Sequence, residues 1–215
     1  MIVRYWMSKD PIVATEAMDL LQVVNLLRTH GLRRLPVVRG RELCGLISAT
    51  DLYRFMNPSV FYTASMPAAL CDELRERAVH DHMILSPFTC GPNDPLEEVG
   101  DQMRREKIGS LPVVREGALE GIITDTDVFA ALTLLARWGE EGKRVCFRIP
   151  VEEKLEIFYK IMNLCQQHEV DLLTILTHSI QEESAHLVML RVRGERAGEL
   201  IENLWKTRYQ VLMVE

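Results

Sequence analysis

The sequence predicts an α+β fold in which a β-α-β-β-α unit occurs twice and a β-α-β-β-α-β segment follows. The first observation is an internal repeat, because identical residues recur 76 positions apart, such as Val3 with Val79 and Pro11 with Pro87. The second is that short apolar runs alternate with segments of helical periodicity inside each copy. The third is a change of pattern after about residue 143, where a different order of elements begins.

The repeat aligns without a gap. The run Leu35–Arg39 falls on Leu111–Arg115, and both runs read Leu-Pro-Val-Val-Arg. Because only two copies exist, we expect a closed pair of units rather than a solenoid. Further matches at the same offset are Met7 with Met83, Leu20 with Leu96, Gly45 with Gly121, and Asp51 with Asp127.

Each copy predicts a short strand after its proline, at residues 12–14 and 88–90, and then an amphipathic helix. Asp94, Pro95 and Glu97 predict the start of the second of these helices, with Asp94 as its N-cap. The apolar residues at helical spacing are Leu20, Val23, Val24 and Leu27 in the first copy, and Leu96, Val99 and Met103 in the second.

Two further apolar runs in each copy predict a pair of strands joined by a short turn. They occupy residues 35–38 and 43–47 in the first copy, and residues 111–114 and 119–123 in the second. A second helix is expected from about Ala49 and from about Asp125.

Composition excludes several classes of protein. The chain has 215 residues and a net charge of −6, which disfavours nonspecific binding to nucleic acid. No apolar run approaches the roughly 20 residues that span a bilayer, and the first residues lack a signal-peptide core. We therefore expect a cytoplasmic protein that binds neither membranes nor nucleic acid.

The five cysteines are widely spaced and form no Cys-x-x-Cys pair, so neither a disulfide framework nor a zinc site is expected. The pair His80 and His82 flanks Asp81, but we expect no metal there. Walker A, GxGxxG, GxSxG and HExxH motifs are absent, and we expect no enzyme activity.

A second motif follows each Leu-Pro-Val-Val run at the same distance. It reads Gly-hydrophobic-hydrophobic-[Ser/Thr]-x-x-Asp, at Gly45–Asp51 and Gly121–Asp127. Together with the segment Val79–Met83, these motifs resemble the CBS domain family over residues 1 to about 135. The resemblance implies a tandem CBS pair, or Bateman module, with motif 1 at 1–58, a connector at 59–78 and motif 2 at 79–138.

The family resemblance implies two pseudo-symmetric clefts that bind AMP, ADP, ATP or S-adenosylmethionine, with no obligatory cofactor. Ser48 and Thr124 would lie at helix N-termini, which favour a phosphate. Asp51 and Asp127 would accept hydrogen bonds from ribose hydroxyls, and apolar residues beside the two prolines would enclose the adenine. The expected ligand-binding residues are Arg33, Arg34, Pro36, Ser48, Thr50, Asp51, Pro112, Thr124, Thr126 and Asp127.

One position departs from many ligand-binding members of the family, which carry Arg or Lys just before the motif Asp. Thr50 and Thr126 stand there in this chain. Losing that cation weakens binding of a triphosphate most, so we expect AMP or ADP in preference to ATP. Arg33 and Arg34 either compensate in the first copy or are solvated surface charges, and in both cases the two clefts are expected to differ.

A simpler interpretation of the same motif stays open. Ser-x-x-Asp and Thr-x-x-Asp are also helix-capping patterns, and the motif could serve only to start two helices. The chain would then be a structural or protein-interaction module with empty clefts, rather than a regulatory protein that senses an adenine compound.

The C-terminal third, residues 143–215, predicts a ferredoxin-like β-α-β-β-α-β domain. Its first helix should bury Leu155, Phe158, Met162 and Cys165, and its second Ala197, Leu200, Ile201 and Leu204. This order after a CBS pair resembles an ACT domain, and the combination resembles acetoin-utilisation proteins of the AcuB type. We expect a homodimer formed partly through an apolar edge strand, Leu172–Leu176, and a regulated protein target that the sequence does not identify.

Overall fold

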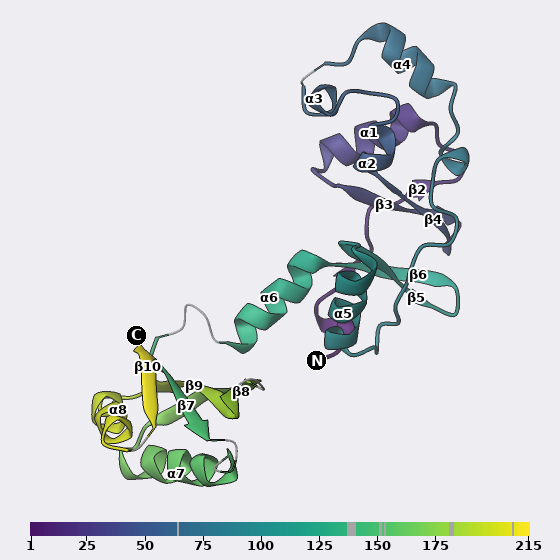
Figure 1. Ribbon diagram of the computed structural model, residues 1–215. Coiled ribbons are helices and arrows are strands. Elements are labelled where there is room, and N and C mark those ends of the chain that lie inside the picture. Colours follow the sequence, from purple (N-terminus) through teal and green to yellow (C-terminus); the bar gives the residue numbers. More distant parts are fainter. Residues whose placement is uncertain (64, 137–140, 151, 153, 181–182, 208) are drawn as a thin grey trace. The chain divides into compact units, whose positions relative to one another are not determined.

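A computed structural model describes the chain from residue 1 to residue 215, except residues 64, 137–140, 151, 153, 181–182 and 208. The chain forms two compact units, Met1–Ala130 and Ala131–Glu215 (Figure 1). Residue 138, the expected end of motif 2, lies outside the described residues. The domain boundaries stay predictions.

The N-terminal unit contains the predicted β-α-β-β-α order in the first copy and the α-β-β-α part of it in the second. The first copy comprises η1 (Val3–Tyr5), β1 (Ser8–Lys9), β2 (Ala14–Thr15), α1 (Leu20–Thr29), β3 (Arg34–Arg39), β4 (Glu42–Ser48) and α2 (Ala49–Leu52). The connector forms α3 (Pro58–Phe61) and α4 (Ala68–Arg75). The second copy comprises η2 (Val79–Asp81), α5 (Leu96–Glu106), β5 (Ser110–Arg115), β6 (Ala118–Thr124) and α6 (Asp125–Leu135).

Two predictions about the start of the second copy were wrong. The α5 helix begins at Leu96 with Pro95 as its N-cap, and no side chain caps it. The Asp94 carboxylate instead accepts a hydrogen bond from the backbone N–H of Gly91 at 2.7 Å, so it closes the preceding turn. The strand expected at 88–90 is reduced to a single bridge between Cys90 and Val113.

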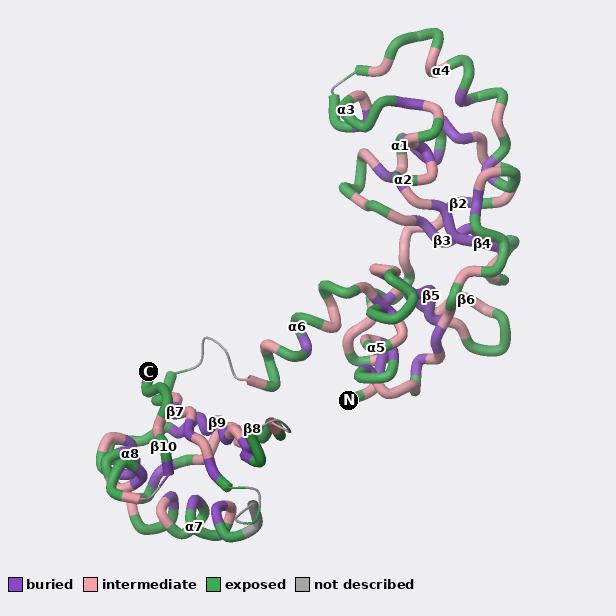
Figure 2. The backbone as a smooth tube through the Cα atoms, viewed as in Figure 1, coloured by how far each residue is buried: buried purple, intermediate pink, exposed green. Residues whose placement is uncertain are grey.

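The apolar faces of α1 and α5 are buried as predicted (Figure 2). Burying one aliphatic side chain contributes about 1.5–3 kcal/mol, so these faces fix each helix against its sheet. The cysteines are free thiols. Burial raises the pKa of Cys90 to about 12, so this thiol stays protonated at neutral pH.

One sheet joins the two copies, with the order β1-β6-β4-β3-β2 and with β5 beside β6. The N-terminal segment of each copy pairs with the second hairpin strand of the other copy. Ser8 lies opposite Ile122 in β6, and Ile84 forms a bridge with Leu46 in β4. Each copy therefore completes the sheet of the other.

Gly121 and Gly45 occupy the two points where these segments cross. A Cβ at Gly121 would lie 2.7 Å from the carbonyl oxygen of Ser8, and a Cβ at Gly45 would lie 2.8 Å from that of Ile84. Both distances are too short for a side chain, so the motif glycines permit the exchange of segments between copies.

The C-terminal unit has the predicted ferredoxin-like arrangement. Its elements are β7 (Lys143–Pro150), α7 (Lys154–Gln167), β8 (Asp171–Ile180), β9 (Ala185–Arg193), α8 (Ala197–Trp205) and β10 (Gln210–Val214). The strands form an antiparallel sheet in the order β10-β7-β9-β8. The β8 strand, which contains the predicted edge segment Leu172–Leu176, therefore lies at an edge of this sheet.

The buried face of α8 agrees with the prediction, whereas that of α7 differs. Ile157, Ile161 and Cys165 are buried in α7, and Met162 is 60% exposed. The predicted face contained Met162 because its spacing from Phe158 also fits a helix. Packing against the sheet selects the neighbouring stripe of two isoleucines and Cys165.

Candidate functional site

A cleft of about 800 Å³ lies between the two copies in the N-terminal unit. The first copy contributes Ser8, Lys9, Asp10, Pro11, Ile12, Gly31, Leu32, Arg33, Arg34, Pro36, Ser48, Ala49, Thr50 and Tyr53. The connector contributes Tyr62, and the second copy contributes Gly109, Ser110, Ile122, Thr124, Asp125 and Thr126. The volume is in the range of small-molecule sites.

The structure brings seven of the ten predicted site residues to this cleft, namely Arg33, Arg34, Pro36, Ser48, Thr50, Thr124 and Thr126. Asp51, Asp127 and Pro112 are not among its lining residues. Three of the predicted side chains therefore lie outside the lining, and the ligand-binding role of all ten stays a prediction.

The Asp51 carboxylate is turned back toward the start of its own helix. Its Oδ2 accepts hydrogen bonds from the Ser48 backbone N–H at 2.9 Å and from Ser48 Oγ at 2.6 Å. The Asp51 N–H in turn donates to Ser48 Oγ at 3.3 Å. These bonds form a capping box, which is the simpler interpretation of the motif.

The second copy repeats this geometry. Asp127 Oδ2 accepts from the Thr124 N–H at 2.8 Å and from Thr124 Oγ1 at 2.6 Å. In the described part of the chain, Oδ1 of Asp51 and Oδ1 of Asp127 accept no hydrogen bond. Capping thus leaves one carboxylate oxygen in each motif for a further donor.

The two helices that follow these caps differ in length. The α2 helix has four residues and the α6 helix has eleven. A helix macrodipole is a sum over aligned peptide units, so α2 contributes little to anion binding. The macrodipole contribution to the expected phosphate preference is therefore weaker at Ser48 than at Thr124.

Three cations and two acids line the cleft. The cations are Lys9, Arg33 and Arg34, and the acids are Asp10 and Asp125. The guanidinium of Arg34 reaches from the first copy to the second, because its Nη1 lies 3.0 Å from where a Cβ of Gly109 would be. Asp125 Oδ2 lies 2.9 Å from the same point.

Gly109 corresponds to Arg33 in the repeat, and Ser110 corresponds to Arg34. The missing side chain at Gly109 makes the room that Arg34 enters. Ser110 is only 4% exposed, and its Oγ has no hydrogen-bond partner among the described residues. The two halves of this cleft are therefore unequal in charge, and the expected difference between two separate clefts stays a prediction.

Two aromatic residues that line the cleft, Tyr53 and Tyr62, are not among the expected ligand-binding residues. Their hydroxyl oxygens lie 3.2 Å apart and share a hydrogen bond. This bond, together with partial burial, raises the pKa of Tyr53 above its usual value. Tyr62 belongs to the connector, which lies outside both CBS motifs but reaches the cleft.

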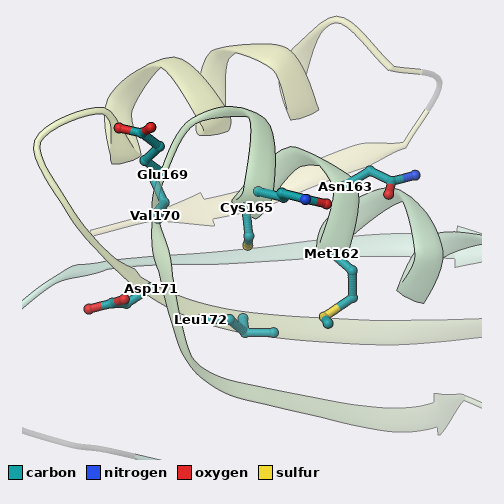
Figure 3. Close-up of a pocket in the computed structure, with 8 residues that line it drawn as sticks. Met162, Asn163, Cys165, Glu169, Val170, Asp171 and Leu172 are labelled. Carbon is teal, nitrogen blue, oxygen red and sulfur yellow. The ribbon is translucent and has the colours of Figure 1, made fainter.

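A second hollow of about 630 Å³ lies in the C-terminal unit, between the end of α7 and the start of β8 (Figure 3). Figure 3 shows Met162 and Cys165 directed from α7 toward the sheet, with the carboxylates of Glu169 and Asp171 at one end. Asp171 pairs with Arg193 at 3.4 Å, which partly neutralises that end.

The sequence's other candidate feature, the His80–His82 segment, lies in η2 and its cap. His80 Nδ1 lies 3.3 Å from the Glu16 carboxylate. Among the described residues, no group of three or more His, Cys, Asp or Glu side chains has the geometry to hold a metal ion.

None of the helices that the structure describes has both the length and the apolar character that a membrane span requires.

Comparison with known proteins finds the CBS domain twice, at residues 3–58 and 79–134. The inosine-5'-monophosphate dehydrogenase of Korarchaeum cryptofilum is 34% identical over 122 residues, which cover 56% of this chain but only 22% of that enzyme. The chain therefore spans only a small part of that relative.

Two solved structures match this chain along nearly their own whole length. The structure of CBSX2 in complex with AMP has a TM-score of 0.53 and 25% identity, over 63% of this chain and 98% of that one. A protein described as a putative acetoin utilization protein (AcuB) from Vibrio cholerae has a TM-score of 0.52 and 27% identity. The match covers 66% of this chain and 98% of that one. With both copies matched, this chain belongs to the CBS domain family and carries its domains as a tandem pair.

Proposed function

We propose that this chain is a regulatory protein that binds an adenine nucleotide or adenosyl compound in the cleft between its two CBS motifs. One observation carries the proposal: hydroxyl side chains from both copies and three cations line the same cleft of about 800 Å³. The AMP complex of CBSX2, a structural neighbour, supports this class of ligand.

The proposed ligand is AMP or ADP, with ATP and S-adenosylmethionine as alternatives. Thr50 and Thr126 supply no charge for a third phosphate, and Asp10 and Asp125 offset part of the charge of the cations. Arg34 and the unpartnered Ser110 hydroxyl are the proposed contacts for a short phosphate group.

Replacing Arg34 by alanine is expected to weaken AMP binding by about tenfold to a hundredfold, because a hydrogen bond to a charged group contributes about 1.5–3 kcal/mol. Calorimetric titration with AMP, ADP, ATP and S-adenosylmethionine measures the effect and the order of affinities. Arg104→Ala is the matched control, since Arg104 is exposed on α5 and pairs with Asp101 at 2.7 Å.

The control variant should bind AMP as the unchanged chain does. If none of the four compounds produces heat or a thermal shift at millimolar concentration, the ligand proposal is wrong. The second candidate, a structural or protein-interaction module with an empty cleft, would then be favoured by the capping geometry of Asp51 and Asp127.

In this proposal the chain catalyses no reaction and acts in the cytoplasm on a protein target, while the C-terminal domain acts as an ACT-like assembly module. The AcuB neighbour supports acetoin metabolism as one context for that target.

We expect the chain to be a homodimer in solution, with the β8 edge contributing to the contact. This edge has no neighbouring strand in the described sheet order, and Leu176 on it is partly exposed. Light scattering should give twice the chain mass at micromolar concentration and a weaker dimer for a chain that ends near Gly139. A monomeric full-length chain would refute the dimer. If the shortened chain dimerises as tightly as the full-length chain, the β8 edge does not contribute to the dimer contact.

A further inference from the structure

The connector between the two CBS motifs places an aromatic side chain in the cleft. Tyr62 follows α3 and lies outside both segments that match the CBS domain, residues 3–58 and 79–134. It nevertheless lines the cleft together with Tyr53, which follows α2. A pair of tyrosines from the motif and the connector is therefore a feature of this chain that the matched segments do not contain.

The connector tyrosine is held in place by its neighbours. Phe61 is buried and packs edge-to-face on both rings, at 6.1 Å from the Tyr53 centroid and 5.2 Å from that of Tyr62. Asn57 accepts a hydrogen bond from the Ser59 N–H at 2.9 Å, which caps α3. Arg28 on α1 donates a hydrogen bond to the carbonyl oxygen of Thr63.

Although the backbone is anchored, the Tyr62 side chain itself is 72% exposed. An aromatic ring fixed at the wall of a cleft but not packed into the core can be covered by a planar ligand at little cost in ordering. The bond between the two hydroxyls orients the rings further, because each hydroxyl restricts rotation of the other.

We propose that Tyr62, supported by Tyr53, is the stacking platform for the purine ring of the ligand, so that the connector determines the preference for a nucleotide over its sugar phosphate alone. This inference rests on the proposed function. Stacking uses the π-face of the base and leaves phosphate recognition to the cations Lys9, Arg33 and Arg34.

Calorimetric titration of the full chain with AMP and with ribose 5-phosphate, which lacks the base, tests this role. Tyr62→Ala should weaken AMP binding by about tenfold, which is the scale of one base–aromatic stack. The same variant should bind ribose 5-phosphate as the unchanged chain does. Tyr62→Phe keeps the ring and loses the hydroxyl, so it should stay within about twofold of the unchanged chain for AMP.

Tyr5→Ala is the matched control, because Tyr5 is similarly exposed and does not line the cleft. Equal AMP affinity of Tyr62→Ala and the unchanged chain would overturn the stacking role alone. An equal loss for AMP and ribose 5-phosphate would also overturn it, since the effect would not depend on the base. If the unchanged chain binds no adenine compound, the proposed function fails and this inference fails with it.

Discussion

Replacing Gly121 by alanine is expected to lower the free energy of unfolding by about 1–3 kcal/mol, the usual cost of forcing extra atoms into a packed site. The added Cβ would lie 2.7 Å from the carbonyl oxygen of Ser8 and 3.0 Å from Met7 Sδ. The first obstacle is backbone, which cannot rotate away as a side chain can. The β1 strand must therefore move off β6, and the pairing that joins the two copies weakens.

Urea unfolding monitored by circular dichroism measures this change. Gly198→Ala is the matched control, because Gly198 lies in α8 and an added Cβ would meet only the end of the flexible Lys143 side chain, at 3.3 Å. Alanine favours a helix over glycine by about 1 kcal/mol, so the control should be neutral or stabilising. Equal stability of Gly121→Ala and the unchanged chain would contradict the proposed close crossing.

Replacing Asp51 by alanine is expected to reduce both stability and ligand affinity. Asp51 is the N3 member of the capping box, and the Ser48 backbone N–H loses its partner when the carboxylate is removed, which should cost about 0.5–1.5 kcal/mol of folding free energy. If the free Oδ1 accepts a ribose hydroxyl, AMP affinity should also fall by about tenfold to a hundredfold. Asp127→Ala should behave in the same way at its own motif.

Asp19→Ala separates the two effects. Asp19 forms a capping box at α1 with Gln22, whose backbone N–H donates to Asp19 Oδ1 at 2.8 Å. It belongs to neither of the two Ser/Thr-x-x-Asp motifs. It should therefore lose stability and keep AMP affinity. Melting temperature and dissociation constant are measured for the three single variants and for the double variant of Asp51 and Asp127. Unchanged affinity in Asp51→Ala, in Asp127→Ala and in the double variant would reject the ribose role and leave capping alone.

Much of the N-terminal fold could be predicted because its signals are local. A 76-residue repeat and helical spacings specify the order of elements without reference to distant contacts. The prediction failed where one residue has two competing partners: Asp94 fits a cap by its spacing, yet it bonds to the Gly91 N–H. In α7, two neighbouring stripes were both apolar, and only packing on the sheet distinguished them.

The candidate site was predicted less completely, for a related reason. The motifs identified the junctions between strand and helix that carry Ser48, Thr50, Thr124 and Thr126 in the two copies. They could not show that Asp51 turns back toward Ser48, since a carboxylate can cap a helix or face a ligand with the same sequence spacing.

The sequence by itself determined the duplicated architecture, the CBS motifs and the ferredoxin-like order of the last third, since each depends on periodicity and short-range residue patterns. Only the tertiary structure decided that β1 crosses to β6, that Arg34 enters the space left by Gly109, and that Tyr62 reaches the cleft. These contacts join residues far apart in the chain, and they form because strand pairing and core packing bring distant segments together.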